Sequence, residues 1–80
     1  METIPLSFLP PGTEAVVNYI RAGEGLTRHL VAMGLRPESP LTVICADRGS
    51  LIVSVAGSRY ALSKGMAMKI LVKKIEVKAQ

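Results

Sequence analysis

The stretch from residue 25 to residue 40 reads GLTRHLVAMGLRPESP and decides how the rest of the chain must fold. It is the only part of the 80 residues whose apolar side chains recur at a helical spacing. Positions i, i+4 and i+7 of this stretch are apolar, which predicts one short amphipathic helix. The residues of this apolar stripe are Leu26, Leu30 and Met33.

The same stretch also predicts where this helix ends. Gly34 provides a left-handed residue at which a helix stops, and Leu35 is placed to fold back on Leu30 in a Schellman-type contact. Pro37 prevents the helix from continuing. The sequence therefore predicts a helix that ends abruptly and turns a corner.

Strand patterns surround the helix on both sides. A β-branched and aromatic run at residues 14–20 follows the turn signal LPPG, and two alternating runs within residues 40–55 flank a turn at Asp47, Arg48 and Gly49. Alternation places Leu41, Val43 and Cys45 on one face. A burial preference of free cysteine then predicts that Cys45, the only cysteine, is a buried thiol.

The second half of the chain continues in short strands. We predict a tight turn at Gly57 and Ser58, a strand carrying Tyr60 and Leu62, and one helical turn capped by Ser63. A last strand at residues 69–77 has Ile70 and Val72 on one face. Met33, Met66 and Met68 are interpreted as core-filling residues.

These elements predict a mainly β fold in a single domain spanning residues 1–80. About five consecutive strands joined by tight turns are too few for two packed sheets, and they favour a small antiparallel barrel with the one helix closing an open end. No apolar run approaches the roughly 20 residues that span a bilayer, and the start of the chain lacks the features of a signal peptide. We therefore expect a cytoplasmic protein without membrane insertion.

The net charge of +4 comes entirely from the C-terminal end. Residues 1–63 carry five arginines and five acidic residues, whereas five lysines after residue 63 face only Glu76. Such a patch could attract nucleic acid, or it could keep a terminal edge strand soluble. The scarcity of aromatic side chains favours the edge-strand interpretation. The lysines are Lys64, Lys69, Lys73, Lys74 and Lys78.

No residues in the sequence are spaced as a catalytic or metal-binding constellation. The single histidine, His29, has no acidic residue one helical turn away, and the acidic residues are scattered singly. Nucleophile, base and orienting group cannot be assembled from such a set, so we predict no catalytic residue and no enzyme activity. Metal sites need clustered ligands, so we assign no metal ligand and interpret His29 as a surface residue.

Several motifs in sequence order resemble the ferrous iron transport protein A (FeoA) family over about residues 6–77. These are LPPG, AVVNYI, the helix LTRHLVAMGLRPESPLTV, a Val-x-Gly-x-x-x-x-Leu pattern at residues 55–62 and an Ala-x-x-Ile-x-Val pattern at residues 67–72. The chain departs from the family after GLRP, where the family usually has glycine and this chain has Glu38, and in a short hairpin loop, ADRGS.

The resemblance implies an SH3-like barrel of the bacterial cytoplasm that assists the membrane-bound, GTP-dependent ferrous iron transporter. It also implies that the same barrel occurs as the C-terminal domain of metal-dependent repressors. Three interpretations follow: an interaction module, a barrel that itself binds divalent metal such as ferrous iron, or a basic nucleic-acid-binding barrel. The first is favoured, with no resident cofactor and no nucleic acid as partner, and a homodimer is left open.

The helix itself provides candidate partner-binding residues. If the apolar stripe is buried, Arg28 and His29 lie on other faces of the helix and Arg36 follows at its exposed exit. Arginine suits protein interfaces because its planar guanidinium binds carboxylates through two hydrogen bonds. We therefore predict that Arg28, His29 and Arg36 form a surface that docks on an acidic patch of the transporter's cytoplasmic domain.

Overall fold

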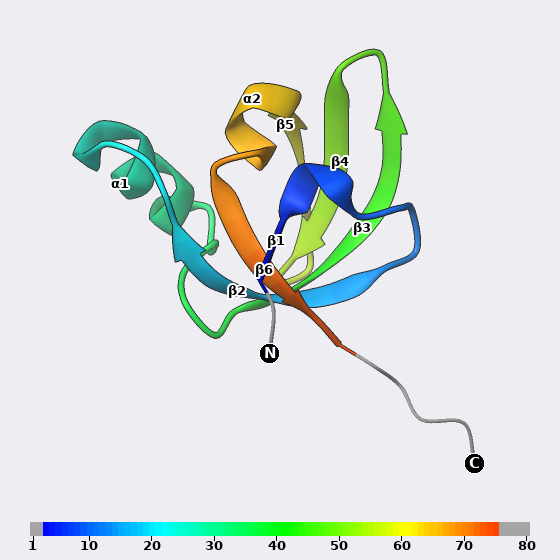
Figure 1. Cartoon of the computed structure of the whole chain (residues 1–80), viewed down its shortest axis with the longest axis horizontal. Coiled ribbons are helices and arrows are strands. Elements are labelled where there is room, and N and C mark those ends of the chain that lie inside the picture. The colour runs from blue at the N-terminus through cyan, green and yellow to red at the C-terminus, as the bar shows by residue number, and fades with distance from the viewer. Residues whose placement is uncertain (1–2, 76–80) are drawn as a thin grey trace.

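The computed structural model describes residues 3–75 and folds them around one curled antiparallel sheet (Figure 1). Within these residues there are six strands, two α-helices and one 3-10 helix, η1. The elements in chain order are β1 (Ile4–Pro5), η1 (Leu6–Phe8), β2 (Glu14–Ile20), α1 (Glu24–Ala32), β3 (Pro40–Asp47), β4 (Ser50–Val55), β5 (Ser58–Ser63), α2 (Lys64–Ala67) and β6 (Ile70–Lys74).

The strand order in the sheet is β1-β6-β2-β3-β4-β5. The predicted mainly β antiparallel fold is therefore confirmed, with six strands in the described residues rather than about five. The added strand, β1, has only two residues and pairs with β6 at Val72 and Leu71. A two-residue strand leaves no alternating pattern in the sequence, so periodicity could not reveal it.

The sheet curls around a core of aliphatic side chains. Alternate residues of β3, β4 and β5 point inward, and α1, α2 and η1 each add side chains to the same cluster. No buried polar or charged residue lies among residues 3–75. The core consists of Leu6, Leu9, Ala15, Val17, Leu30, Leu35, Leu41, Val43, Leu51, Val53, Val55, Leu62, Ala67, Ile70 and Val72.

The predicted helix and its abrupt end are confirmed. The N–H of Leu35 donates to the carbonyl of Leu30 at 3.0 Å, and the N–H of Gly34 donates to the carbonyl of Val31 at 2.9 Å. These are the two hydrogen bonds of a Schellman motif, and Gly34 has the left-handed φ of 99° that the motif requires. Leu30 and Leu35 are both fully buried, so the corner is fixed by packing as well as by hydrogen bonds.

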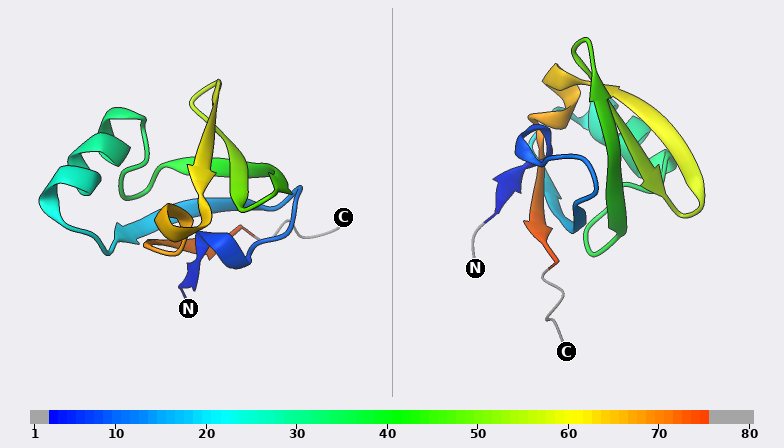
Figure 2. Two further views of the ribbon diagram at one scale, coloured as in Figure 1. Left: turned by 90° about the horizontal axis from the view of Figure 1, so that it is seen from above. Right: turned by 90° about the vertical axis from the view of Figure 1, so that its right-hand side faces the viewer.

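Two separate helices add side chains to the core of the barrel. Of the predicted apolar stripe only Leu30 is fully buried, whereas Leu26 and Met33 are partly buried and pack against the core. The second helix is α2, which packs against η1, β4 and β5, apart from α1 (Figures 1 and 2). Its predicted cap is confirmed, since the N–H of Met66 donates to Ser63 Oγ at 3.2 Å.

The prediction that Cys45 is buried is wrong. The register of β3 against β4 shifts between Val43, which lies opposite Val53, and Cys45, which lies opposite Ile52. This bulge inserts one extra residue, so the side chains that follow it change face. Cys45 is therefore exposed on the outer face of the sheet.

The interpretation of the C-terminal lysines as part of an edge strand is also wrong. β6 lies between β1 and β2, so it is an inner strand, and β5 and β1 form the two edges of the described sheet. Long-range pairing decides which strand lies at an edge, and the terminal position in the sequence does not. Lys73 and Lys74 lie opposite Val16 and Ala15 of β2, whereas Lys78 lies outside the described residues.

Two smaller predictions also need correction. Met33 and Met66 pack against the core as predicted, but Met68 at the end of α2 is 56% exposed. The tight turn between β4 and β5 is formed by Ala56 and Gly57 rather than by Gly57 and Ser58. Both central residues have positive φ, 52° and 84°, which defines a type I′ hairpin turn.

Candidate functional site

All three side chains that were predicted to bind a partner are exposed. Arg28 and His29 lie on the outer side of α1, and Arg36 lies in the segment that leads from α1 to β3. The structure thus confirms that they are accessible, but it records no contact that joins the three into one cluster. We call Arg28, His29 and Arg36 the helix-exit surface.

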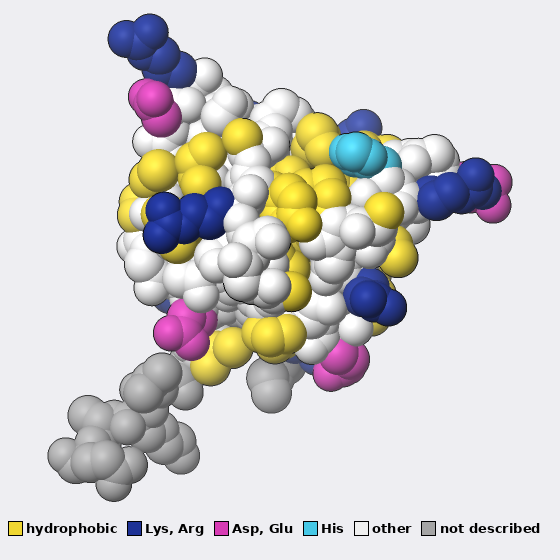
Figure 3. All heavy atoms as spheres, turned by 180° about the vertical axis from the view of Figure 1, so that it is seen from behind, with side chains coloured by type: hydrophobic (Ala, Val, Ile, Leu, Met, Phe, Trp, Pro, Cys, Tyr) yellow, Lys and Arg dark blue, Asp and Glu magenta, His cyan; other side chains and the backbone are white. Residues whose placement is uncertain are grey.

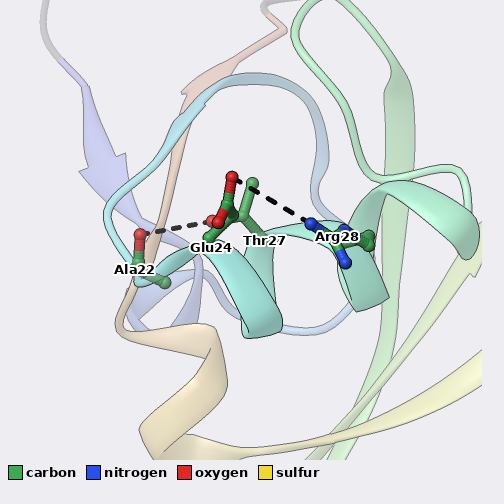
Figure 4. A network of polar contacts seen from close by, with 4 residues as sticks. All are labelled: Ala22, Glu24, Thr27 and Arg28. Atoms are coloured by element: carbon green, nitrogen blue, oxygen red, sulfur yellow. Dashed lines mark hydrogen bonds and ion pairs between the residues drawn. The ribbon is translucent and has the colours of Figure 1, made fainter.

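Arg28 already has a partner on its own helix. Its guanidinium lies 4.0 Å from a carboxylate oxygen of Glu24, one turn earlier, and both side chains are at least 79% exposed (Figure 4). The Thr27 hydroxyl donates to the carbonyl of Ala22 at 3.3 Å and holds the start of the helix, whose cap residue is a glycine. An exposed pair of this kind contributes well under 1 kcal/mol, so Arg28 can exchange Glu24 for a partner's carboxylate.

Arg36 lies beside a hollow that the sequence did not reveal. The hollow has a volume of about 260 Å³ and is mostly apolar, with Arg36 and Ser39 as its polar members. Arg36 forms no ion pair with any of residues 3–75. We call this hollow the corner pocket, and its lining residues are Gly34, Arg36, Ser39, Pro40, Val55 and Ala56.

Backbone hydrogen bonds hold the corner pocket in place. The N–H of Glu38 donates to the carbonyl of Val17 at 2.8 Å, and the N–H of Val17 donates to the carbonyl of Ser39 at 2.9 Å. These bonds tie the segment after α1 to β2. Glu38 adopts a left-handed φ of 76°, at the position where the resembled family usually has glycine.

The corner pocket joins regions that are distant in the sequence. The end of β4 and its turn meet the exit of α1 about twenty residues earlier in the chain. Local periodicity carries no information about such a contact, so sequence reasoning missed Val55 and Ala56 as site residues. Pro40 gave no signal either, because the first residue of a strand is an ordinary position for proline.

Chemically, the pocket suits an apolar side chain that is flanked by a carboxylate. The apolar lining can cover an aliphatic or aromatic group, and the nearby guanidinium can bind an acidic group through two hydrogen bonds.

Aliphatic and aromatic side chains also remain exposed elsewhere, and Figure 3 shows apolar patches with isolated charged side chains around them. The exposed large residues are Phe8, Tyr19, Val31, Met68 and Ile75.

A second hollow lies at the opposite end of the β3–β4 hairpin. It has a volume of about 180 Å³ and lies between the hairpin residues 46–51, the segment containing Ser7 and Leu9, and Lys64. Ser7 Oγ is buried and has no hydrogen-bond partner within the described residues. The charged residues at this hollow are Asp47, Arg48 and Lys64, which carry mixed signs.

Neither hollow brings together the residues of a metal centre. Residues 3–75 contain no group of three or more His, Cys, Asp or Glu side chains close enough to hold one ion. His29 and Cys45 lie on different elements. In the same part of the chain, no helix has both the length and the apolar character needed to cross a membrane.

The curled six-stranded sheet, closed by short helices around an aliphatic core, is a small SH3-like barrel. The FeoA domain model matches residues 4–74, and the chain therefore belongs to the FeoA domain family. The confirmed Schellman corner and the buried Ala67, Ile70 and Val72 are the structural basis of two of the motifs on which the resemblance rests.

Relatives and solved structures agree with this assignment. A Methanocaldococcus jannaschii protein with the provisional name Fe(2+) transport protein A is 43% identical over 72 residues, which cover 90% of this chain and 88% of the relative. The crystal structure of an iron uptake regulatory protein (FeoA) superposes with a TM-score of 0.86 at 36% identity, covering 94% of this chain and all of the other.

The fold also occurs within larger proteins. A manganese-dependent transcriptional repressor superposes with a TM-score of 0.87 at 20% identity, and the match covers 94% of this chain but 42% of the repressor. An identity this low shows a common fold alone. The likeness implied by the sequence between this chain and a domain of metal-dependent repressors is thus confirmed at the level of fold.

Proposed function

We propose that this chain is a non-enzymatic accessory protein of ferrous iron uptake, which docks in the cytoplasm on the soluble part of the GTP-dependent ferrous iron transporter. Membership of the FeoA family supports the link to iron transport. The name of the archaeal relative supports the same link. The observation that carries the docking site is Arg36, an arginine without an ion pair in residues 3–75 beside an apolar pocket.

In this proposal, the corner pocket provides affinity and the helix-exit surface provides charge complementarity. An apolar side chain of the transporter fills the pocket, and a neighbouring carboxylate pairs with Arg36. Arg28 leaves Glu24 to pair with a second acidic residue, which costs little because both side chains are exposed. Arg36 therefore contributes more to binding than Arg28 and His29, which both lie outside the pocket.

Charge reversal tests this order. Arg36→Glu should weaken binding of the transporter's cytoplasmic domain by about tenfold to a hundredfold, because it places like charges face to face. Arg28→Glu should weaken binding less, and the double variant most. Binding is measured by surface plasmon resonance or pull-down with the isolated domain, and ferrous iron uptake is measured in cells that carry each variant.

Arg48→Glu is the matched control, since it makes the same charge change at the exposed tip of the β3–β4 hairpin. All these side chains are exposed, so the melting curves should stay close to that of the unmodified protein. Normal binding and uptake in the folded double variant would contradict the proposed docking site. An equal loss in Arg48→Glu would show a general charge effect instead.

We further infer that the chain acts without a resident metal ion and without catalytic activity of its own. The described residues offer no cluster of ligands, and His29 and Cys45 lie on different elements. Calorimetric titration with ferrous, manganous and zinc ions should give no saturable binding at one site. A stoichiometric site of micromolar affinity would favour a metal-responsive barrel, and a salt-dependent mobility shift with RNA or DNA would favour a nucleic-acid-binding barrel.

A further inference from the structure

β5 is an edge strand whose outer side has no partner within the described part of the chain. It pairs with β4 alone. The register is unbroken, from Val55 opposite Ser58 at the turn to Ser50 opposite Ser63 at the far end. Figure 2 (right) shows β5, in yellow, as the outermost strand of the sheet. Six residues of regular strand at an edge form a template for pairing with another strand.

The turn geometry determines which backbone groups of β5 point outward. In a two-residue type I′ hairpin the residues that flank the turn, Val55 and Ser58, form a hydrogen-bonded pair. Because bonded and non-bonded pairs alternate along an antiparallel ladder, the N–H and C=O groups of every second residue turn away from β4. These residues are Arg59, Ala61 and Ser63, and all three are exposed.

β5 carries few of the features by which proteins protect an edge. Its sequence SRYALS contains neither lysine nor proline, and its pairing with β4 has no bulge. Arg59 is its only charged residue. Lysine, proline and bulges are the usual means of preventing a second strand from pairing.

We propose that β5 pairs with β5 of a second copy of this chain, in antiparallel orientation around a two-fold axis at Ala61. In this register Ala61 lies opposite Ala61 of the second copy. Each outward-pointing N–H of one β5 donates to an outward-pointing C=O of the other. Arg59 then lies opposite Ser63 of the second copy, so no like charges face each other directly. The pairing is isologous, as in every two-fold symmetric dimer, and two-fold symmetry is the commonest symmetry of homo-oligomers.

The side chains on the outer face of the sheet support pairing with a second copy in this register. Cys45, Ile52 and Ala61 lie opposite one another across β3, β4 and β5 and form an apolar row that ends at the free edge. Pairing at Ala61 continues the row directly into the same row of the second copy. On the other face, the partly buried Tyr60 comes to lie opposite Leu62 of the second copy and is covered further.

A single charge at the two-fold axis tests the register. Ala61→Lys places two lysines opposite each other at the centre of the pairing, and the dimer should be lost. Ala32→Lys is the matched control, because Ala32 is also an exposed alanine but lies on α1. Sedimentation velocity over a range of concentrations should show a weak dimer for the unmodified protein and for Ala32→Lys, and a monomer for Ala61→Lys.

Hydrogen exchange tests the same contact without any substitution. Exchange of the Arg59, Ala61 and Ser63 amides should slow as the protein concentration rises, whereas exchange of exposed amides in α1 should not change. Added salt should not weaken the dimer. The charged side chains that the pairing brings near each other are Arg59 and Lys64 of opposite copies, which repel, and salt screens this repulsion. A protein that stays monomeric up to about 1 mM, a dimer retained by Ala61→Lys, or a dimer dissociated by salt would overturn the proposal.

Discussion

The corner after α1 and the turn between β4 and β5 use the same backbone device in different surroundings. Each contains a glycine with a left-handed φ, 99° at Gly34 and 84° at Gly57. A Cβ atom added at Gly34 would lie 3.3 Å from Cγ1 of Val55, whereas one added at Gly57 would meet nothing within 4 Å. The corner therefore needs glycine for backbone conformation and for space, and the turn needs it for conformation alone.

The same two regions contain residues that strain the backbone. Glu38 follows the corner with a φ of 76°, and Ala56 precedes Gly57 with a φ of 52°. For residues other than glycine, asparagine and aspartate, this backbone conformation is unfavourable by about 1 kcal/mol or more. Ala56 lines the corner pocket and Glu38 immediately precedes the lining residue Ser39, so strained backbone lies in the pocket wall at Ala56 and next to it at Glu38.

The largest expected effect is that of Gly34→Val. Strain of a β-branched residue at positive φ and overpacking against Val55 should together lower the free energy of unfolding by about 3 kcal/mol. Gly57→Val is the matched control and should lose about 1 to 2 kcal/mol, from strain alone. Urea denaturation of both variants measures the difference in the free energy of unfolding. Equal losses would show that overpacking against Val55 adds nothing to the backbone strain.

Glu38→Gly should stabilise the protein by about 1 kcal/mol, because glycine adopts a positive φ without strain. In a domain of this size, that gain raises the melting temperature by about 4 to 8 °C. Glu38→Ala removes the same carboxylate and keeps the strain, so its melting temperature should hardly change. A melting temperature that rises equally in both variants would point to the charge of Glu38 instead of its backbone.

The smallest expected effect is that of Ala56→Asn, which should stabilise by about 0.5 kcal/mol. Asparagine tolerates a left-handed conformation, and Asn-Gly is the preferred pair in type I′ turns. Ala56→Ser is the control, since serine is polar but has no such preference. A thermal melt of the three proteins distinguishes them, and a gain in Ala56→Ser equal to that in Ala56→Asn would argue against a conformational cause.

The sequence predicted correctly those local structures that depend on only a few neighbouring residues. Leu30, Gly34 and Leu35 lie close enough together to specify a Schellman motif, and Ser63 specifies its helical turn in the same way. The boundaries of β2 follow from a β-branched run between two turn signals. The exposure of Arg28 and His29 followed from the helical period, and that of Arg36 from its place after the end of the helix. Their role as a docking surface stays a prediction.

Tertiary structure alone decided the features that depend on pairing between distant segments. Cys45 became exposed because the register of β3 against β4 shifts, and periodicity within β3 cannot show a bulge that only β4 defines. β6 became an inner strand and β5 an edge because of strand order. Alternation and capping determine each element over a few residues, whereas edges, bulges and the corner pocket arise only when chain segments tens of residues apart pack together.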